Sequence, residues 1–179
     1  MFTAAPLIET ERLILRGHCA ADFDAEAALW ADERVVRYIG GTPSSREASW
    51  GRLLRYPGHW QMLGFGYWAV VVKPLTGSDE SAPFIGEIGI ADYQRQITPS
   101  LAGMGEMGWV LSPDFHGKGY AFEAAQAVIN WADTHLTRPL CCIIDPEHQS
   151  SIRLAEKCGF VAHTDTEYQG TAARIFKRG

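Results

Sequence analysis

The sequence contains no apolar run close to the roughly 20 residues that a membrane-spanning helix requires. The first ten residues also lack a basic segment followed by an apolar one, which is the pattern of a secretory signal peptide. Internal repeats, low-complexity tracts and linker-like segments are missing as well. We therefore expect one soluble domain spanning residues 1–179, with no membrane partner.

Cysteine is scarce, and its spacing excludes two kinds of site. The four cysteines form no C-x-x-C pair and have no histidines at the spacing of a zinc finger. Neither a disulfide framework nor a structural metal is indicated, and we expect the protein to need no metal ion. Reduced thiols are typical of the cytoplasm, which is the expected location.

Positive charge is also limited. Sixteen Lys and Arg residues stand against 21 Asp and Glu residues, which gives a formal net charge of -5. Proteins that bind nucleic acid need a basic face to neutralise phosphates, so no nucleic-acid partner is expected. The acidic balance better fits a cationic or neutral substrate.

What is present is the pattern of a folded α+β domain. Helical periodicity and capping signals predict four helices, the second with Ser44 and Glu47 at capping-box spacing and ended by Pro57 and Gly58. These helices are expected at residues 20–31, 44–58, 121–131 and 150–158. β-branched and aromatic runs predict strands at residues 12–16, 67–72, 84–90, 104–111 and 140–144, from residue 160 onward, and at 173–177. A polar turn at residues 74–83 joins two antiparallel strands.

Residues 116–121 read His-Gly-Lys-Gly-Tyr-Ala and lie where a strand gives way to a helix. At the start of a helix, free backbone N–H groups and the positive end of the helix dipole converge, which favours an anionic phosphate. Glycine permits both positive φ and close approach of the ligand. Alternative phosphate motifs fail here, because the P-loop needs glycine in place of Ser112, and the dinucleotide fingerprint needs glycine in place of Phe122. Taken alone, the turn is also compatible with a helix start that binds nothing.

With its neighbours, this segment resembles the GNAT acetyltransferase superfamily, whose pyrophosphate loop reads Gln/Arg-x-x-Gly-x-Gly/Ala. His116 replaces the usual Gln or Arg at the first position. Because that loop binds mainly through its backbone N–H groups, the replacement is expected to preserve binding. Nearly the whole chain is similar to the RimJ/RimL-like branch, through residues 10–16, 85–89, 105–111 and 151–160.

The resemblance implies the GNAT fold: a mostly antiparallel central sheet flanked by helices, in which family strands four and five splay apart. It also implies acetyl-CoA as the acetyl donor, with its pantetheine arm lying in the gap like an added strand. The residues implied in binding it are Trp109, Val110, Leu111, His116, Gly117, Lys118, Gly119, Tyr120, Ala121, Phe122, His148 and Ser151.

Acetyl transfer to an amine needs a base, and two glutamates are candidates. Glu106 lies ten residues before His116, the spacing of a family glutamate that acts through water, and is the preferred base; a structural ion pair is its alternative role. Glu87 is the rival base and could instead bind the substrate ammonium. The strand and helix aromatics Trp50, Tyr56, Trp60, Tyr67 and Trp109 are expected in the core rather than the cleft.

The departing thiolate needs a proton. The tyrosine that often supplies it is replaced by Ala155, while Ser151 matches a serine proposed for this role in the RimJ/RimL-like branch; as a residue at a helix start it could equally be a cap. His148 replaces the usual asparagine three residues earlier and could bond the pantetheine or shuttle a proton.

Two functions remain open at this stage. The first is an enzyme that transfers acetyl from acetyl-CoA to a primary amine, either a protein N-terminus or a small-molecule amine, by direct attack. The second is a non-catalytic acyl-CoA-binding sensor or assembly module, suggested by the departures at His116, His148 and Ala155. The resemblance leaves the oligomeric state open, with a homodimer as a form common among relatives.

Overall fold

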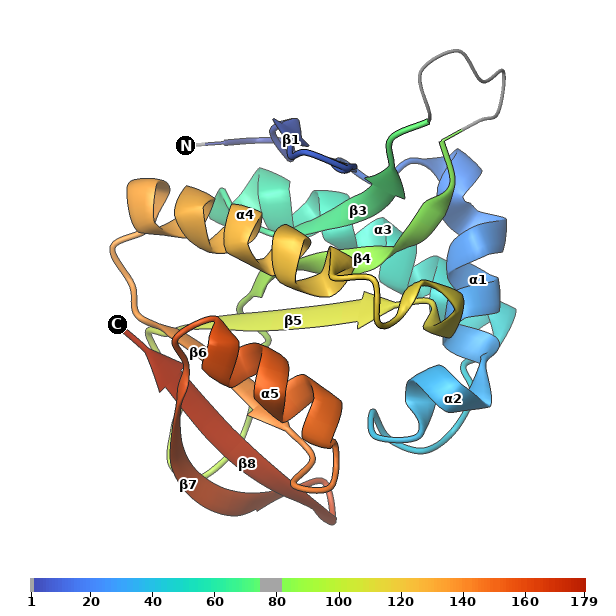
Figure 1. Ribbon diagram of the computed structural model, residues 1–179. Helices are drawn as coiled ribbons and strands as arrows, with labels where there is room; N and C mark the ends of the chain where they lie inside the picture. Colours follow the sequence, from blue (N-terminus) through green and yellow to red (C-terminus); the bar gives the residue numbers. More distant parts are fainter. Residues whose placement is uncertain (1, 75–81) are drawn as a thin grey trace.

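The centre of the protein is an eight-stranded sheet, seen in a computed structural model that describes residues 2–74 and 82–179 (Figure 1). All neighbouring strands run antiparallel except β5 and β6, which are parallel. This confirms the expected α+β class with a mostly antiparallel sheet. In spatial order the strands are β1 (Ile8–Glu9), β2 (Leu13–Arg16), β3 (Tyr67–Val72), β4 (Phe84–Ala91), β5 (Gly105–Leu111), β6 (Leu140–Ile144), β8 (Thr171–Arg178) and β7 (Val161–Tyr168).

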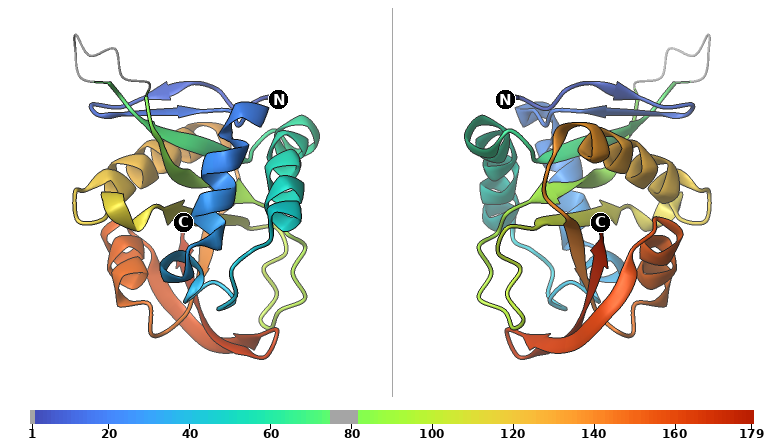
Figure 2. Two further views of the ribbon diagram at one scale, coloured as in Figure 1. Left: turned by 90° about the vertical axis from the view of Figure 1, so that its right-hand side faces the viewer. Right: turned by 90° about the vertical axis from the view of Figure 1, so that its left-hand side faces the viewer.

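Helices cover both faces of the sheet (Figure 2). α1 (Phe23–Ala31) and α3 (Arg46–Leu63) lie on one face, and α4 (Tyr120–His135) lies on the other. The short helix α2 (Glu33–Val36) follows α1, and α5 (Gln149–Lys157) lies beside α4. Two 3-10 turns, Ala20–Asp22 and Pro113–Phe115, precede α1 and α4.

The largest part of the core lies under α4. Ala124, Ala125 and Val128 are completely buried there, in the same cluster as Ile88 and Ile90 of β4. Small alanine side chains allow a helix to approach a sheet closely, and tight packing holds it rigidly. The start of α4 is thereby fixed near the end of β5.

Helix α3 differs from the sequence prediction at both ends. Its N-cap is Ser45, whose hydroxyl accepts a hydrogen bond from the Ala48 N–H at 3.1 Å, so the capping box expected at Ser44 and Glu47 was wrong. The expected end at residues 57–58 was also wrong, because the helix continues through Pro57 to Leu63. A proline inside a helix costs about 3 kcal/mol, and burial of the two flanking aromatic side chains, Tyr56 and Trp60, opposes that cost.

The remaining elements agree with the prediction to within a few residues, apart from β1 and α2, which had no clear sequence signal. The polar turn expected at residues 74–83 falls largely on residues 75–81, which lie outside the described residues. In the part of the chain that is described, none of the helices combines the length and the hydrophobicity needed to cross a bilayer.

Candidate active site

β5 and β6 are joined at one end only, and this leaves a gap in the sheet. Their parallel ladder contains two residue pairs, Gly105 with Leu140 and Glu106 with Cys141. Beyond these pairs β5 stays paired to β4 along its other edge, while β6 diverges from it (Figure 1). The far half of β5, residues 109–111, therefore offers a strand edge to which an extended ligand can add, and at its end the Leu111 carbonyl oxygen lies 2.9 Å from Nε2 of His116.

Two cavities meet at this divergence. One, of about 290 Å³, lies between the start of α4 and the start of α5. The other, of about 330 Å³, reaches across β4, β5 and α3. Trp109, Val110, His148 and Ser151 line both cavities, so a molecule held in the first can present one end to the second.

The start of α4 presents a row of unpaired backbone N–H groups. Gly117 and Gly119 have φ of 73° and 83°, in the left-handed region that favours glycine. The first N–H to be bonded within the helix is that of Glu123, which donates to the Gly119 carbonyl. Among the described residues, none accepts a hydrogen bond from the N–H groups of residues 117–122. Apart from Lys118, these residues line the smaller cavity, and unpaired N–H groups at the start of a helix are a typical site for an anion.

The opening strand motif holds this loop in place. Glu123 accepts hydrogen bonds from the Thr10 hydroxyl at 2.6 Å, from the Arg12 backbone N–H at 2.8 Å and from the Arg12 guanidinium at 2.7 Å. The same guanidinium donates to the Lys118 carbonyl at 2.8 Å. Burial opposes ionisation of Glu123, but these bonds prevail and lower its pKa. Arg12 thus ties the glycine loop to the first turn of α4.

Replacing Arg12 with Gln should weaken binding of acetyl-CoA, the ligand that the sequence resemblance implies for this loop, because the Lys118 carbonyl loses its charged donor and the loop is free to relax. Hydrogen bonds to charged groups contribute about 1.5–3 kcal/mol, so we expect a loss of about tenfold in affinity, measured by calorimetry. The matched control is Arg178→Gln. Arg178 of β8 makes a bidentate ion pair with Asp133, which lies near the far end of α4 from the glycine loop. Equal losses in the two variants would contradict a loop-holding role for Arg12.

Ser151 lies at the boundary of the two cavities, and its hydroxyl group donates no hydrogen bond to the described residues. The indole N–H of Trp109 donates to the Ser151 hydroxyl oxygen at 2.8 Å, so that oxygen acts as an acceptor and can still donate. His148 is the N-cap residue of α5, its ring stacks on Tyr38 at 4.5 Å, and burial lowers its pKa. Ala155, in the position of the family tyrosine, is completely buried and offers no proton.

Glu106 lines the larger cavity, but its carboxylate is engaged. The Arg95 guanidinium donates to both of its oxygens, at 2.6 and 2.7 Å. A bidentate pair of this kind is among the stronger polar contacts in proteins. This is the structural ion pair that the sequence left open as the alternative role of Glu106.

Glu87 lies in the same cavity and has a different environment. It is 1% exposed, and one carboxylate oxygen accepts hydrogen bonds from the Tyr56 hydroxyl and from the Trp30 indole N–H. Its other oxygen has no hydrogen-bond partner among the described residues. Burial raises its pKa to about 7, against the opposing effect of the two hydrogen bonds. A carboxyl group with such a pKa can exchange a proton near neutral pH.

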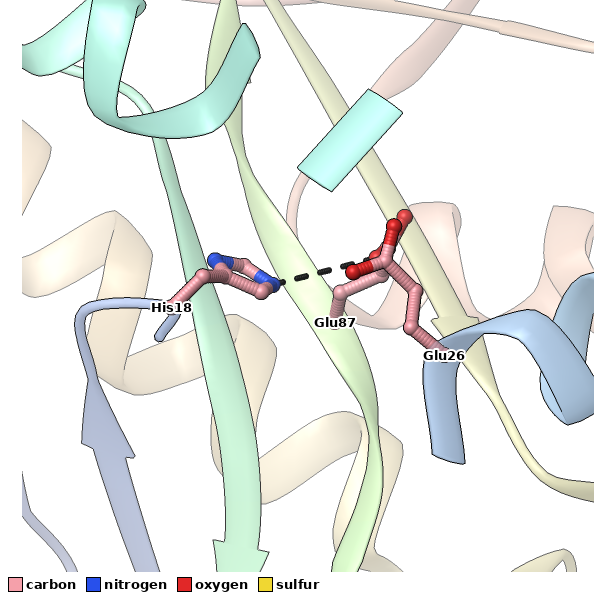
Figure 3. Close-up of side chains that lie close together, drawn as sticks. All are labelled: His18, Glu26 and Glu87. Atoms are coloured by element: carbon pink, nitrogen blue, oxygen red, sulfur yellow. Dashed lines mark ion pairs between the residues drawn. The ribbon is translucent and has the colours of Figure 1, made fainter. Parts of the chain in front are cut away.

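Two further titratable groups lie behind Glu87 (Figure 3). Glu26 of α1 is completely buried, and burial together with the charge of Glu87 raises its pKa to about 8. His18 lies 3.8 Å from Glu87, and burial lowers its pKa to about 4, so it is neutral at pH 7. Near neutral pH the two carboxyl groups therefore favour holding a proton between them rather than two negative charges.

The ligand atoms of His18, Glu26 and Glu87 lie within 4.8 Å of one another, a spacing that would also suit a divalent cation. The charges of Arg52 and Arg55 oppose this use, because both guanidinium groups are near enough to lower the pKa of each carboxyl group. A proton shared by the carboxyl groups relieves their repulsion without adding a second positive ion to this region. We therefore interpret the cluster as a proton-holding site.

Replacing Glu26 with Gln should make stability less sensitive to pH. Between its ordinary pKa of 4.5 and about 8, the folded protein binds this proton more tightly than the unfolded chain does, so wild-type stability falls as the pH rises through that window. Glutamine does not titrate, and we expect the variant to gain on the order of 1–3 kcal/mol relative to wild type between pH 5 and pH 8. Urea unfolding at both pH values measures the difference. The exposed Glu47→Gln control should show no such gain.

Two glycines make room for Tyr67 on the floor of the larger cavity. Tyr67 pairs with Gly89 across β3 and β4, and its side chain lies over Gly108 of β5. A Cβ atom on Gly108 would collide with the Tyr67 hydroxyl group, and one on Gly89 would collide with the Tyr67 backbone. The ring also stacks on Tyr56 at 5.1 Å. The cavity floor is therefore aromatic and fixed by the sheet.

Sequence reasoning missed several residues of this cavity. Tyr56, Trp60 and Tyr67 are buried in the core as expected, but Tyr56 and Tyr67 also line this cavity, which the sequence did not indicate. Trp109 lines both cavities, as its expected contact with the cofactor requires, and Trp50 is 40% exposed rather than part of the core. Arg52 and Arg55 were not singled out at all. One signal for Glu26 was present, because it lies four residues before Trp30, on the buried face of α1.

The family follows from this fold and from direct comparison. A family model described as "Acetyltransferase (GNAT) domain" matches residues 12–161. The chain therefore belongs to the GNAT acetyltransferases, in their RimJ/RimL-like family, which uses acetyl-CoA. The resemblance seen in the sequence is confirmed.

Several relatives share somewhat more than a quarter of their residues with this chain. The uncharacterized N-acetyltransferase YnaD of Bacillus subtilis is 28% identical over 85% of this chain and 81% of its own length. A GNAT-family acetyltransferase structure from Bordetella pertussis is 27% identical, with a TM-score of 0.81 over 98% of this chain and all of the other. An acetyltransferase structure from Agrobacterium tumefaciens has the same identity and TM-score over all of this chain and 97% of the other.

More distant structures share the fold alone. They include a ribosomal-protein-S5-alanine acetyltransferase from Vibrio fischeri, at 18% identity and a TM-score of 0.71, covering 97% of this chain and 96% of that one. A spermidine N-acetyltransferase from Vibrio cholerae, solved with CoA and spermine, is also 18% identical, with a TM-score of 0.67 over 94% of both chains. Proteins of this fold thus include enzymes named for protein and for small-amine acceptors.

Proposed function

We propose that this protein acetylates a primary amine by direct attack, with Glu87 as the base and Ser151 as the proton donor to the thiolate. The supporting observation is the meeting of two cavities at Trp109 and Ser151: unpaired amides line one, and a buried carboxyl group with a pKa near 7 lines the other.

The residues of the smaller cavity fit acetyl-CoA. Free N–H groups at residues 117–122 can bind its pyrophosphate, and the open edge of β5 at residues 109–111 can pair with its pantetheine arm. The cosubstrate supplies an acetyl group activated as a thioester. Lys118 adds positive charge at the rim, although its ammonium group also donates to the Asp114 carbonyl at 3.0 Å.

Glu87 is better suited than Glu106 to accept a proton from the substrate amine. Its proton affinity suits neutral pH, and its first oxygen is linked to the cavity by the hydrogen bond from Tyr56, whereas its second oxygen is buried toward His18. Glu106 keeps both oxygens on Arg95 and would have to break that pair to act. This reverses the preference drawn from spacing along the sequence, and we assign Glu106 the role of fixing Arg95 in the cavity wall.

Ser151 holds a hydroxyl proton where both cavities meet, which is where the thiolate must be protonated. The Trp109 indole orients it by occupying its acceptor side. No hydrogen bond from Ser151 to the start of α5 accompanies this contact in the described part of the chain, which favours the donor role over capping.

The test is release of free thiol from acetyl-CoA in the presence of a panel of primary amines, with the acetylated product identified by mass spectrometry. Amine-dependent release supports the enzyme. Tight acetyl-CoA binding with no turnover of any amine would instead favour a non-catalytic acyl-CoA-binding module.

A further inference from the structure

Two arginines on α3 line the larger cavity. Arg52 and Arg55 lie three residues apart and therefore on one side of the helix, together with Tyr56. The Arg52 guanidinium stacks on the Trp30 ring, 3.6 Å from its centroid, and lies 3.5 Å from the Ser44 hydroxyl. These contacts orient the side chain and leave hydrogen-bond donors of the guanidinium available, since it carries five.

Neither arginine has a carboxylate partner in residues 2–74 and 82–179. Arg95, the third arginine of the cavity, pairs with Glu106, whereas Arg52 and Arg55 take part in no ion pair within the described ranges. Glu87 is nearby, but one of its oxygens is occupied by Tyr56 and Trp30, and the other lies toward His18. The wall formed by α3 therefore presents two positive charges to whatever enters.

We infer that the acceptor is a small amine that also carries an acidic group, a carboxylate or a phosphate, which Arg52 and Arg55 bind. Guanidinium groups recognise both anions through paired N–H donors. A cavity of about 330 Å³ lies at the lower end of ligand sites, which suits a molecule of amino-acid size. With its acidic group on α3, the amine of such a molecule can point toward Glu87 and the thioester. The inference rests on the proposed acetyl transfer.

The test compares amines that differ only in the acidic group. Free amino acids are set against their carboxamides, and phosphoethanolamine against ethanolamine, each with acetyl-CoA. In one of these two series we expect kcat/KM to be at least tenfold higher for the acid than for its neutral partner. The series that shows this difference identifies the anion as a carboxylate or a phosphate. Arg52→Gln and Arg55→Gln should each lower kcat/KM about tenfold more for the acid than for its neutral partner, with the extra loss mainly in KM, because either change also shifts the pKa of Glu87 and so affects both members of a pair.

A matched control is Arg46→Gln. Arg46 lies on the same helix, but its guanidinium pairs with Asp24 on the surface and stacks on Phe23 at 4.5 Å. Arg46→Gln should leave kcat/KM unchanged for both the acids and their neutral partners. Arg52 and Arg55 could instead serve only as counter-charges for the buried carboxyl groups. In that case Arg52→Gln and Arg55→Gln would lower the melting temperature and would slow acetylation of the acidic amine and of its neutral partner equally, which would overturn the inference.

Binding provides a readout that does not depend on turnover. With CoA present, acidic compounds should raise the melting temperature of the wild type more than their amides do, and the two arginine variants should lose that difference. If no acid is acetylated and none shifts the melting temperature, the inference is overturned. Equal turnover of acids and amides overturns it as well, while leaving the proposed acetyl transfer intact.

Discussion

Glu87→Gln should lower kcat/KM for amine acetylation by about 10²–10⁴-fold, the range that general-base catalysis usually contributes. Glutamine keeps the shape of the side chain and can still accept hydrogen bonds from Tyr56 and Trp30, so the fold should survive. Acetyl-CoA affinity should stay near the wild-type value, because the amides that we propose to bind the cofactor line the other cavity, beyond Trp109 and Ser151. Steady-state kinetics and calorimetry measure the two quantities separately.

The pH profile identifies the base. A carboxyl group accepts a proton only when ionised, and Glu87 has a pKa of about 7, so wild-type kcat/KM should rise with pH up to about 7 and then level off. This rise should vanish in Glu87→Gln. The matched variant Glu106→Gln breaks the pair with Arg95 and should weaken acceptor binding while keeping the rise. Loss of the rise in Glu106→Gln alone would return the role to Glu106.

Gly119→Val should reduce acetyl-CoA binding more than tenfold. Valine is strained at a φ of 83°, and its Cβ atom would lie 3.3 Å from the Arg12 guanidinium that holds the loop. Its methyl groups would also stand where a phosphate must approach the backbone. Calorimetric titration with acetyl-CoA measures the loss.

The control for this variant is Gly170→Val in the β7–β8 hairpin. Gly170 has a φ of 79° with no other atom near its Cβ position, so it carries the same backbone strain far from the cavities. Both variants should lose stability to a similar degree, and only Gly119→Val should lose affinity. Unchanged affinity in folded Gly119→Val would mean that the pyrophosphate does not lie on these amides.

The features that the sequence predicted well are set by neighbours along the chain. Two glycines between a strand and an alanine-rich helix define a helix start with free N–H groups, whatever surrounds it. The fold class followed from the order of strands and helices together with the family motifs. Element boundaries failed at Pro57, where burial of aromatic side chains from distant parts of the chain outweighs a local helix-breaking residue.

The choice between two glutamates could not be read from the sequence, because it depends on contacts made across the fold. Arg95 reaches Glu106 from a loop eleven residues away, while Glu87 is enclosed by Trp30 of α1 and Tyr56 of α3. Which of these carboxyl groups is paired and which is desolvated follows from helix docking. Spacing relative to His116 carries no information about it.

The charge of the acceptor also could not be predicted from the sequence, because it depends on which side chains the fold brings into the cavity. A net charge of -5 favoured a cationic or neutral substrate, but that number sums over the whole chain. The acidic acceptor that we infer would instead meet Arg52 and Arg55, two positive charges on one face of α3 that line the larger cavity. Local charge near a binding site decides recognition more directly than the total does.

The glycines beneath Tyr67 have a consequence for how this scaffold can diversify. Any side chain at Gly108 would push the phenol ring upward into the space an acceptor must enter. A single methyl group at Gly108 would thus shrink the larger cavity without replacing any of the side chains that line it. Selectivity for the acceptor can therefore differ between related proteins through the residue at the position of Gly108 in the sheet, which a comparison of the side chains lining the cavity would overlook.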